Sequence, residues 1–191
     1  MEIGTLIILA FLIVIILYAV FTYNGLVSLK HNVSKAWSNI DVLLKQRHDE
    51  LPKLVEVCKQ YMEYEKDTLE KVIQARSAVS NARNAGNIGA LGEAETQLRL
   101  GLGNLFALAE NYPELKANQS FQQLQARISQ LENSIADRRE VYNESVNLNN
   151  IRIEQFPDVI IAKAFNFKPF DLLEFSEEEI RDVNIKSLFN S

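Results

Sequence analysis

The sequence has few of the residues that build cross-linked or turn-rich proteins. It contains one cysteine, seven glycines and four prolines in 191 residues. A single cysteine excludes an intrachain disulfide framework and a cysteine-based zinc site. The shortage of glycine and proline argues against collagen-like and turn-rich all-β folds, and it favours long helices.

The sequence also lacks a basic excess and any motif that carries a reaction. Asp and Glu number 25 against 20 Lys and Arg, a formal net charge of −5, whereas nucleic-acid-binding domains usually present a basic face. The two histidines, His31 and His48, have no partner at metal-ligand spacing. Phosphate-binding, dinucleotide-binding and serine-nucleophile glycine motifs are absent from the sequence. We therefore predict a protein that is not an enzyme, with no catalytic residues, metal, cofactor or nucleic-acid partner.

The N-terminus carries one long apolar run, since no charged residue occurs between Ile3 and Phe21. About 20 apolar residues cross a hydrocarbon core of ~30 Å as a helix. A cleaved signal peptide would need a positive start and a small-residue cleavage site, but the chain starts Met1-Glu2 and no Ala-x-Ala motif follows the run. The sequence thus predicts an uncleaved, single-pass transmembrane anchor over residues 1–22, in the cell membrane.

Lysines near the end of this run indicate its orientation. Lys30 and Lys35 follow the run within about 15 residues, and no Lys or Arg precedes it. The positive-inside rule therefore predicts a short outer N-terminus and a cytoplasmic body.

The body, residues 23–155, repeats apolar residues at spacings of three and four, the pattern of helices with one buried face. Four helices are expected, over residues 24–47, 51–79, 91–109 and 121–150. Pro52, the loop 84–89 and Pro113 separate them, and Phe156-Pro157 ends the fourth. Short connections favour an all-α antiparallel four-helix bundle over coiled-coil rods.

The expected helix lengths raise a difficulty. The second and fourth helices would be about ten residues longer than the first and third, an overhang of roughly 15 Å at 1.5 Å per residue. Helices that return to the bilayer at that length would collide with it. The bundle would have to tilt, the anchor helix would have to extend above the surface, or Pro52 would have to be a kink and not a reversal.

The tail, residues 156–191, is apolar and aromatic at first and then acidic. A fourth helix that returns toward the membrane would bring four phenylalanines to its surface, so we expect membrane-surface or partner contacts at Phe156, Phe165, Phe167 and Phe170. Packing of the same segment on the open end of the bundle is the equal alternative. Ser176 and Glu179 form a capping box, which predicts a short helix from about Glu177.

Four residues are candidates for a polar layer or a binding site: Trp37, Arg139, Tyr142 and Asn143. Trp37 is the only tryptophan, and its indole N–H requires a partner if it is buried. The other three lie in the polar second half of the fourth helix, where buried polar groups must pair with one another or with the first helix. A layer that fixes helix register is the favoured interpretation, and a site for a small anionic or polar ligand is the alternative.

The same residues resemble the LemA family of bacterial membrane-anchored proteins. The resemblance rests on residues 23–27, 32–33, 36–47, 49–55, 75–76, 110–117, 135–136, 139, 142–143 and 156–157. Departures are Lys53 where the family usually has Asn, Tyr64 where a His is frequent, and Leu148-Asn149 where a second Tyr-Asn is common. The pattern runs from the apolar segment to about Phe170. It implies one N-terminal transmembrane helix and a four-helix bundle, and it implies no reaction.

Together these features predict a membrane-anchored scaffold or adaptor. We expect its partners to be the lipid bilayer and either other membrane proteins or a second copy of the chain, as a homo-oligomer. The alternative is a membrane-tethered sensor that binds a polar ligand within the bundle.

Overall fold

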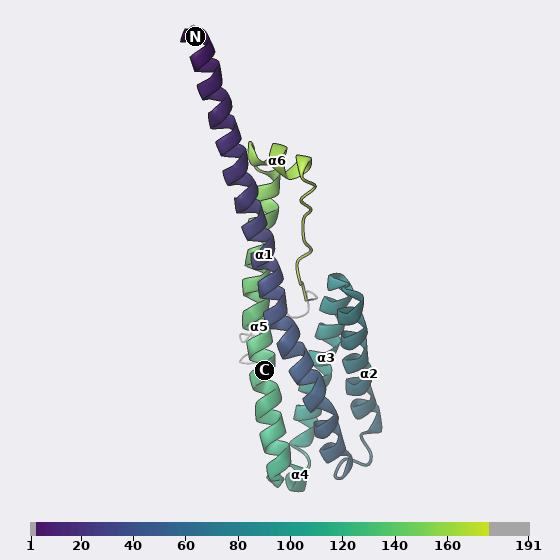
Figure 1. Ribbon diagram of the computed structural model, residues 1–191. Helices are drawn as coiled ribbons and strands as arrows, with labels where there is room; N and C mark the ends of the chain where they lie inside the picture. The colour runs from purple at the N-terminus through teal and green to yellow at the C-terminus, as the bar shows by residue number, and fades with distance from the viewer. Residues whose placement is uncertain (1–2, 176–191) are drawn as a thin grey trace, which may run out of the picture. The chain divides into compact units, whose positions relative to one another are not determined.

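The computed structural model describes residues 3–175, and this part of the chain is helical with no strand (Figure 1). The helices in order are α1 (Ile3–Lys59), α2 (Lys66–Ala85), α3 (Ile88–Ala109), α4 (Pro113–Ala117), α5 (Gln119–Glu154) and α6 (Asp158–Ala164). The predicted all-α class, with a long apolar N-terminal helix and a packed helical body, is confirmed. The short helix predicted from about Glu177 lies outside the described residues.

The described chain divides into two compact units. The anchor unit contains residues 3–39 and 140–171, and the body unit contains residues 40–139 and 172–175. Helices α1 and α5 contribute to both units, and each unit is described separately below.

Among the described helices, only α1 is long and apolar enough to cross a membrane. The apolar stretch is its N-terminal part, which lies in the anchor unit. No side chain in its most apolar stretch is buried. Exposed side chains such as Ile7, Phe11 and Val14 would lie in water if the helix were not covered by lipid or protein. This exposure indicates membrane anchoring.

In the body unit, α1 continues through Pro52 to Lys59, so the predicted separation of two helices at Leu51-Pro52 is wrong. Proline has no N–H for the carbonyl four residues earlier, which here belongs to His48. The Nε atom of Arg76 on α2 donates to this carbonyl at 2.9 Å. A long-range bond thus replaces the missing helical one, and the actual break between helices falls at residues 60–65.

This correction removes the difficulty over helix lengths. The residues after Pro52 extend α1, and α2 and α3 are 20 and 22 residues long. The two lie side by side (Figure 1). Their connection confirms the predicted loop, because Gly86 ends α2 in the left-handed conformation with φ of 65°. The Asn87 Oδ1 atom then accepts the N–H of Ala90 at 3.0 Å and caps α3.

The body core is made by four helical segments: the second part of α1, α2, α3 and the first part of α5. Fully buried side chains from these segments include Leu44, Leu51, Leu54, Val72, Leu91, Leu98, Leu105, Phe121 and Ile128. Two glycines of α3 permit close approach to this core. A Cβ on Gly101 would lie 3.4 Å from the Val72 side chain, and one on Gly92 would lie 1.9 Å from the Glu174 carbonyl oxygen. The chain beyond α6 therefore crosses α3 where the helix has no side chain.

The anchor unit has a smaller core beside α1. Leu26, Ile153 and Ala162 are buried together, and Phe167 packs against them. Phe165 caps α6, the next residue Asn166 has φ of 56°, and the Phe167 N–H donates to the Ala162 carbonyl at 2.9 Å. These are the features of a Schellman motif with asparagine in the place of glycine. The motif turns the chain into the extended segment that follows α6 (Figure 1).

Candidate functional site

A buried carboxylate joins three helices of the anchor unit. Asp158, at the start of α6, is only 4% exposed. Its Oδ1 atom accepts hydrogen bonds from the Tyr18 hydroxyl and from Thr22 Oγ1, the latter at 3.2 Å. Its Oδ2 atom pairs with Arg152 of α5. A buried charge requires such partners, so Asp158 fixes α6 against the last turns of the apolar run.

Aromatic rings cover the next turn of α1. The Tyr23 ring centroid lies 4.8 Å from that of Phe165 and 5.8 Å from that of Phe167. Of the four tail residues predicted to contact a membrane or partner, Phe156 and Phe165 are exposed. Phe167 and Phe170 are partly buried within the unit. Contact of Phe156 and Phe165 with a membrane or a partner stays a prediction.

Polar residues of α5 hold the extended segment after α6. The Asn150 amide bonds both polar groups of Phe170: Nδ2 donates to the carbonyl at 2.9 Å, and Oδ1 accepts the N–H at 3.0 Å. The Tyr142 hydroxyl donates to the Asp171 carbonyl at 2.9 Å. Burial, with a smaller contribution from Asp171, raises the pKa of Tyr142 to about 12. The phenol therefore stays protonated and remains a donor at any physiological pH.

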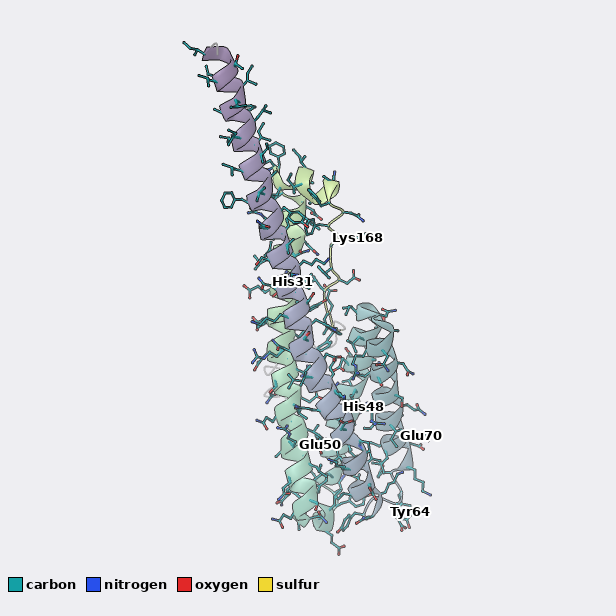
Figure 2. The ribbon with its side chains drawn as sticks, viewed as in Figure 1. His31, His48, Glu50, Tyr64, Glu70 and Lys168 are labelled. Atoms are coloured by element: carbon teal, nitrogen blue, oxygen red, sulfur yellow. The ribbon has the colours of Figure 1, made fainter. Side chains whose placement is uncertain are left out.

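A cavity of about 540 Å³ lies between α1, α5 and this segment, all within the anchor unit. Its lining residues are Tyr23, Val27, Lys30, His31, Asn149 and Phe165 to Phe170. Two lysines, Lys30 and Lys168, contribute positive charge, and no Asp or Glu is among the lining residues. Figure 2 shows His31 on α1 and Lys168 on the segment after α6.

The predicted polar-layer residues fall in both units, with Trp37, Tyr142 and Asn143 in the anchor unit and Arg139 in the body unit. In the anchor unit, the tilted rings of Trp37 and Tyr142 are in contact with their centroids 5.7 Å apart, and Asn143 is half-buried on α5. In the body unit, the Arg139 guanidinium lies 3.7 Å from the centroid of the Phe175 ring. The expectation that these polar groups pair with one another or with the first helix is wrong for Tyr142, because the extended tail offers it a peptide carbonyl.

Sequence reasoning missed the parts of this site that depend on the tail. Asn150, Asp158 and Lys168 were not singled out, although each makes a contact or lines the cavity. Two signals could have found Asn150 and Asp158. Three asparagines are crowded into four positions at 147–150 on an otherwise amphipathic helix, and an aspartate directly follows Pro157 in an apolar segment.

The body unit contains a second buried charged group, on facing helices. The Arg47 side chain on α1 is 1% exposed and pairs with Glu95 of α3 and, at 2.6 Å, with Glu132 of α5. Burial opposes the charged guanidinium, but the two carboxylates outweigh it and raise the pKa of Arg47. Burial raises the pKa of Glu95, and the charge and hydrogen bond of Arg47 oppose this shift. The two buried groups therefore stabilise each other's charged forms.

Two further titratable groups of the body unit, His48 and Cys58, have pKa values shifted by burial. His48, labelled with Glu50, Tyr64 and Glu70 in Figure 2, has its Nε2 atom 2.7 Å from Arg76 Nη2. Burial and this guanidinium lower the pKa of His48, so its neutral ring accepts the bond. Burial raises the pKa of Cys58 to about 11, which leaves it a thiol. Within residues 3–175 no three His, Cys, Asp or Glu side chains are grouped as a metal site.

Comparisons with known proteins give a consistent picture. The model of the LemA family matches residues 36–186. This match starts after the apolar run and extends past Phe170, where the resemblance was expected to end. The chain is 29% identical over 167 residues to "Protein LemA" of Metamycoplasma hominis, covering 87% of this chain and 75% of that protein. It is 24% identical over 208 aligned residues to "Magnetosome protein MamQ 2" of Paramagnetospirillum magneticum, covering 97% and 74%.

Proposed function

The chain belongs to the LemA family, and from that premise we propose that it is a non-enzymatic, membrane-anchored scaffold. In this proposal the apolar part of α1 holds the protein in the cell membrane, and the helices beyond it associate with a second copy of the chain or with other membrane proteins. Lys30 and Lys35 follow the apolar run, which supports a cytoplasmic body and a short outer N-terminus.

An exposed apolar stripe on α5 carries the proposal. Val141, Leu148 and Ile151 are 44%, 52% and 60% exposed. Their spacing of seven and three residues places them on one face of the helix. The buried face of the same stretch is marked by Tyr142, Val146, Asn149 and Ile153. Large apolar side chains aligned on the outer face of a helix are typical of a surface that binds another protein.

The alternative is a ligand-binding module built on Arg139, Tyr142 and Asn143. It is the weaker candidate because two of these groups are occupied by the chain itself. The Tyr142 hydroxyl donates to Asp171, and the Arg139 guanidinium covers the Phe175 ring. A ligand at these groups would have to displace the tail.

Mass photometry of the full chain in mild detergent tests the scaffold. The comparison uses Leu148→Glu, which places a charge in the apolar stripe, and Asn147→Glu, which adds the same charge at a neighbouring exposed position outside it. We expect oligomers for the parent and for Asn147→Glu, and a shift toward monomers for Leu148→Glu. A parent protein that is strictly monomeric with no co-purifying partner would overturn the proposal, as would identical oligomers for all three.

A further inference from the structure

We propose that the cavity beside Tyr23 binds the phosphate group of an anionic membrane phospholipid. Its position is the first argument. Tyr23 directly follows Thr22, which contacts Asp158 beside the last turns of the apolar run. Lys30 lies eight residues beyond Thr22, about 12 Å along the helix axis at 1.5 Å per residue. The flexible lysine stem lets the ammonium group reach back into the headgroup layer.

The charge of the cavity is the second argument. Lys30 comes from α1 and Lys168 from the segment after α6, so the fold brings two cations together from positions far apart in the sequence. Neither ammonium group has a carboxylate within ion-pair distance in the part of the chain that the structure describes. The His31 imidazole lies in the same lining, and so does the buried Asn149 amide, whose Nδ2 atom uses one of its two N–H groups on Asn150 Oδ1 at 3.2 Å. The two cations and the remaining N–H groups match the oxygens of a phosphodiester.

The apolar part of the lining selects a lipid over a free phosphate ion. Val27, Phe165 and Phe167 line the cavity together with the charged groups. A free phosphate would leave these side chains facing water, whereas the glycerol and the first acyl carbons of a phospholipid would cover them. Tyrosine and phenylalanine beside lysine at the end of a span are suited to the membrane interface. The cavity is therefore matched to an amphipathic anion.

The site is held in shape by contacts that do not involve its lysines. Asn150 bonds both the backbone N–H and the carbonyl of Phe170, and the Schellman motif fixes the turn at Asn166. Substitution of Lys30 and Lys168 should therefore change the charge of the cavity and leave the fold intact. The inference does not depend on self-association, because every lining residue belongs to one chain.

The test is a titration of the full-length protein in detergent micelles, followed by native mass spectrometry. The ligands are phosphatidylglycerol, phosphatidylcholine with the same acyl chains, and inorganic phosphate. The variant Lys30→Gln/Lys168→Gln removes both cations, and Lys35→Gln/Lys163→Gln removes two exposed lysines that do not line the cavity. Both variants change the net charge equally, so general attraction between the protein and an anionic lipid affects them alike.

We expect the parent and the control variant to bind phosphatidylglycerol in preference to phosphatidylcholine. The cavity variant should bind phosphatidylglycerol roughly thirtyfold more weakly, the effect of two lysine–phosphate contacts near a membrane surface. Equal weakening in both variants, or no preference between the two lipids, would overturn the site. Displacement of the lipid by millimolar inorganic phosphate would overturn its assignment to a phospholipid. Circular dichroism of each variant checks that its helices are intact.

Discussion

Replacement of Arg47 by methionine should destabilise the body unit strongly. Methionine is similar in length and apolar, so the change removes charge with little loss of packing. It leaves Glu95, whose side chain is 1% exposed, without its partner. Breaking a buried ion pair on one side costs about 3–5 kcal/mol. In a unit of about 100 residues, 1 kcal/mol shifts the unfolding midpoint by roughly 4–8 °C, so Arg47→Met should lower it by at least about 12 °C.

Cys58 supplies the assay, because it is the only cysteine and is fully buried in this unit. Its reaction with a thiol reagent as temperature rises reports the opening of the body unit, independently of the helix held in the detergent. Arg127→Met is the matched control, since Arg127 is exposed on α5 and its loss should cost less than about 0.5 kcal/mol. The double variant Arg47→Met/Glu95→Gln should recover part of the lost stability.

The defect should also depend on pH in a defined direction. Burial already raises the pKa of Glu95, and loss of Arg47 raises it further. In the variant, the folded state therefore takes up a proton more readily than the unfolded state, whose carboxyl keeps its ordinary pKa. Stability of Arg47→Met should rise relative to the parent as pH falls from 8 toward 5.5. A midpoint equal to that of Arg127→Met, or a defect of the same size at both pH values, would refute the reasoning.

Two further predictions concern Arg76 and His48, which are in contact. Arg76→Ala removes the donor to the His48 carbonyl and should cost about 1–3 kcal/mol. Adding Pro52→Ala should restore much of this loss, because alanine supplies the helical N–H. If Cys58 reacts with the thiol reagent as readily in the double variant as in Arg76→Ala, the proposed role of Arg76 is contradicted. Protonation of His48 should destabilise the unit, since its pKa is lowered from 6.5. The stability of the body unit should hold above pH 6.5 and fall below it. His48→Gln should make this fall shallower, and a variant whose stability falls as steeply as the parent's would argue against the role of His48.

The sequence pattern predicts most helices because apolar periodicity is a local property of a buried face. The loop at Gly86, the start of α4 at Pro113 and the end of α5 before Phe156-Pro157 follow from residues that start or stop helices wherever they occur. Pro52 misled the prediction because its effect is decided elsewhere. The guanidinium of Arg76, on the next helix, satisfies the carbonyl that the proline leaves free. A contact of that kind has no periodicity to detect.

The candidate site was predictable only in part, for the same reason. Tyr142 stands out as a polar residue on a buried face, but its partner is a backbone carbonyl of an extended tail. Every residue carries such a carbonyl, so no pattern marks Asp171 as the acceptor. Lys30 was informative about orientation, yet its place in a cavity requires Lys168, which lies far along the chain. Only the fold brings the two together.

The hydrogen bonds from Tyr18 and Thr22 to Asp158 have a mechanical consequence. They attach α6, and with it the segment that carries Lys168, to the last turns of the apolar helix that we propose crosses the bilayer. A transmembrane helix adjusts its tilt to the thickness of the surrounding hydrocarbon. Because the cavity is fastened to that helix, its depth at the interface follows the hydrophobic matching of the span, and a thicker or thinner bilayer would raise or lower the cavity with it.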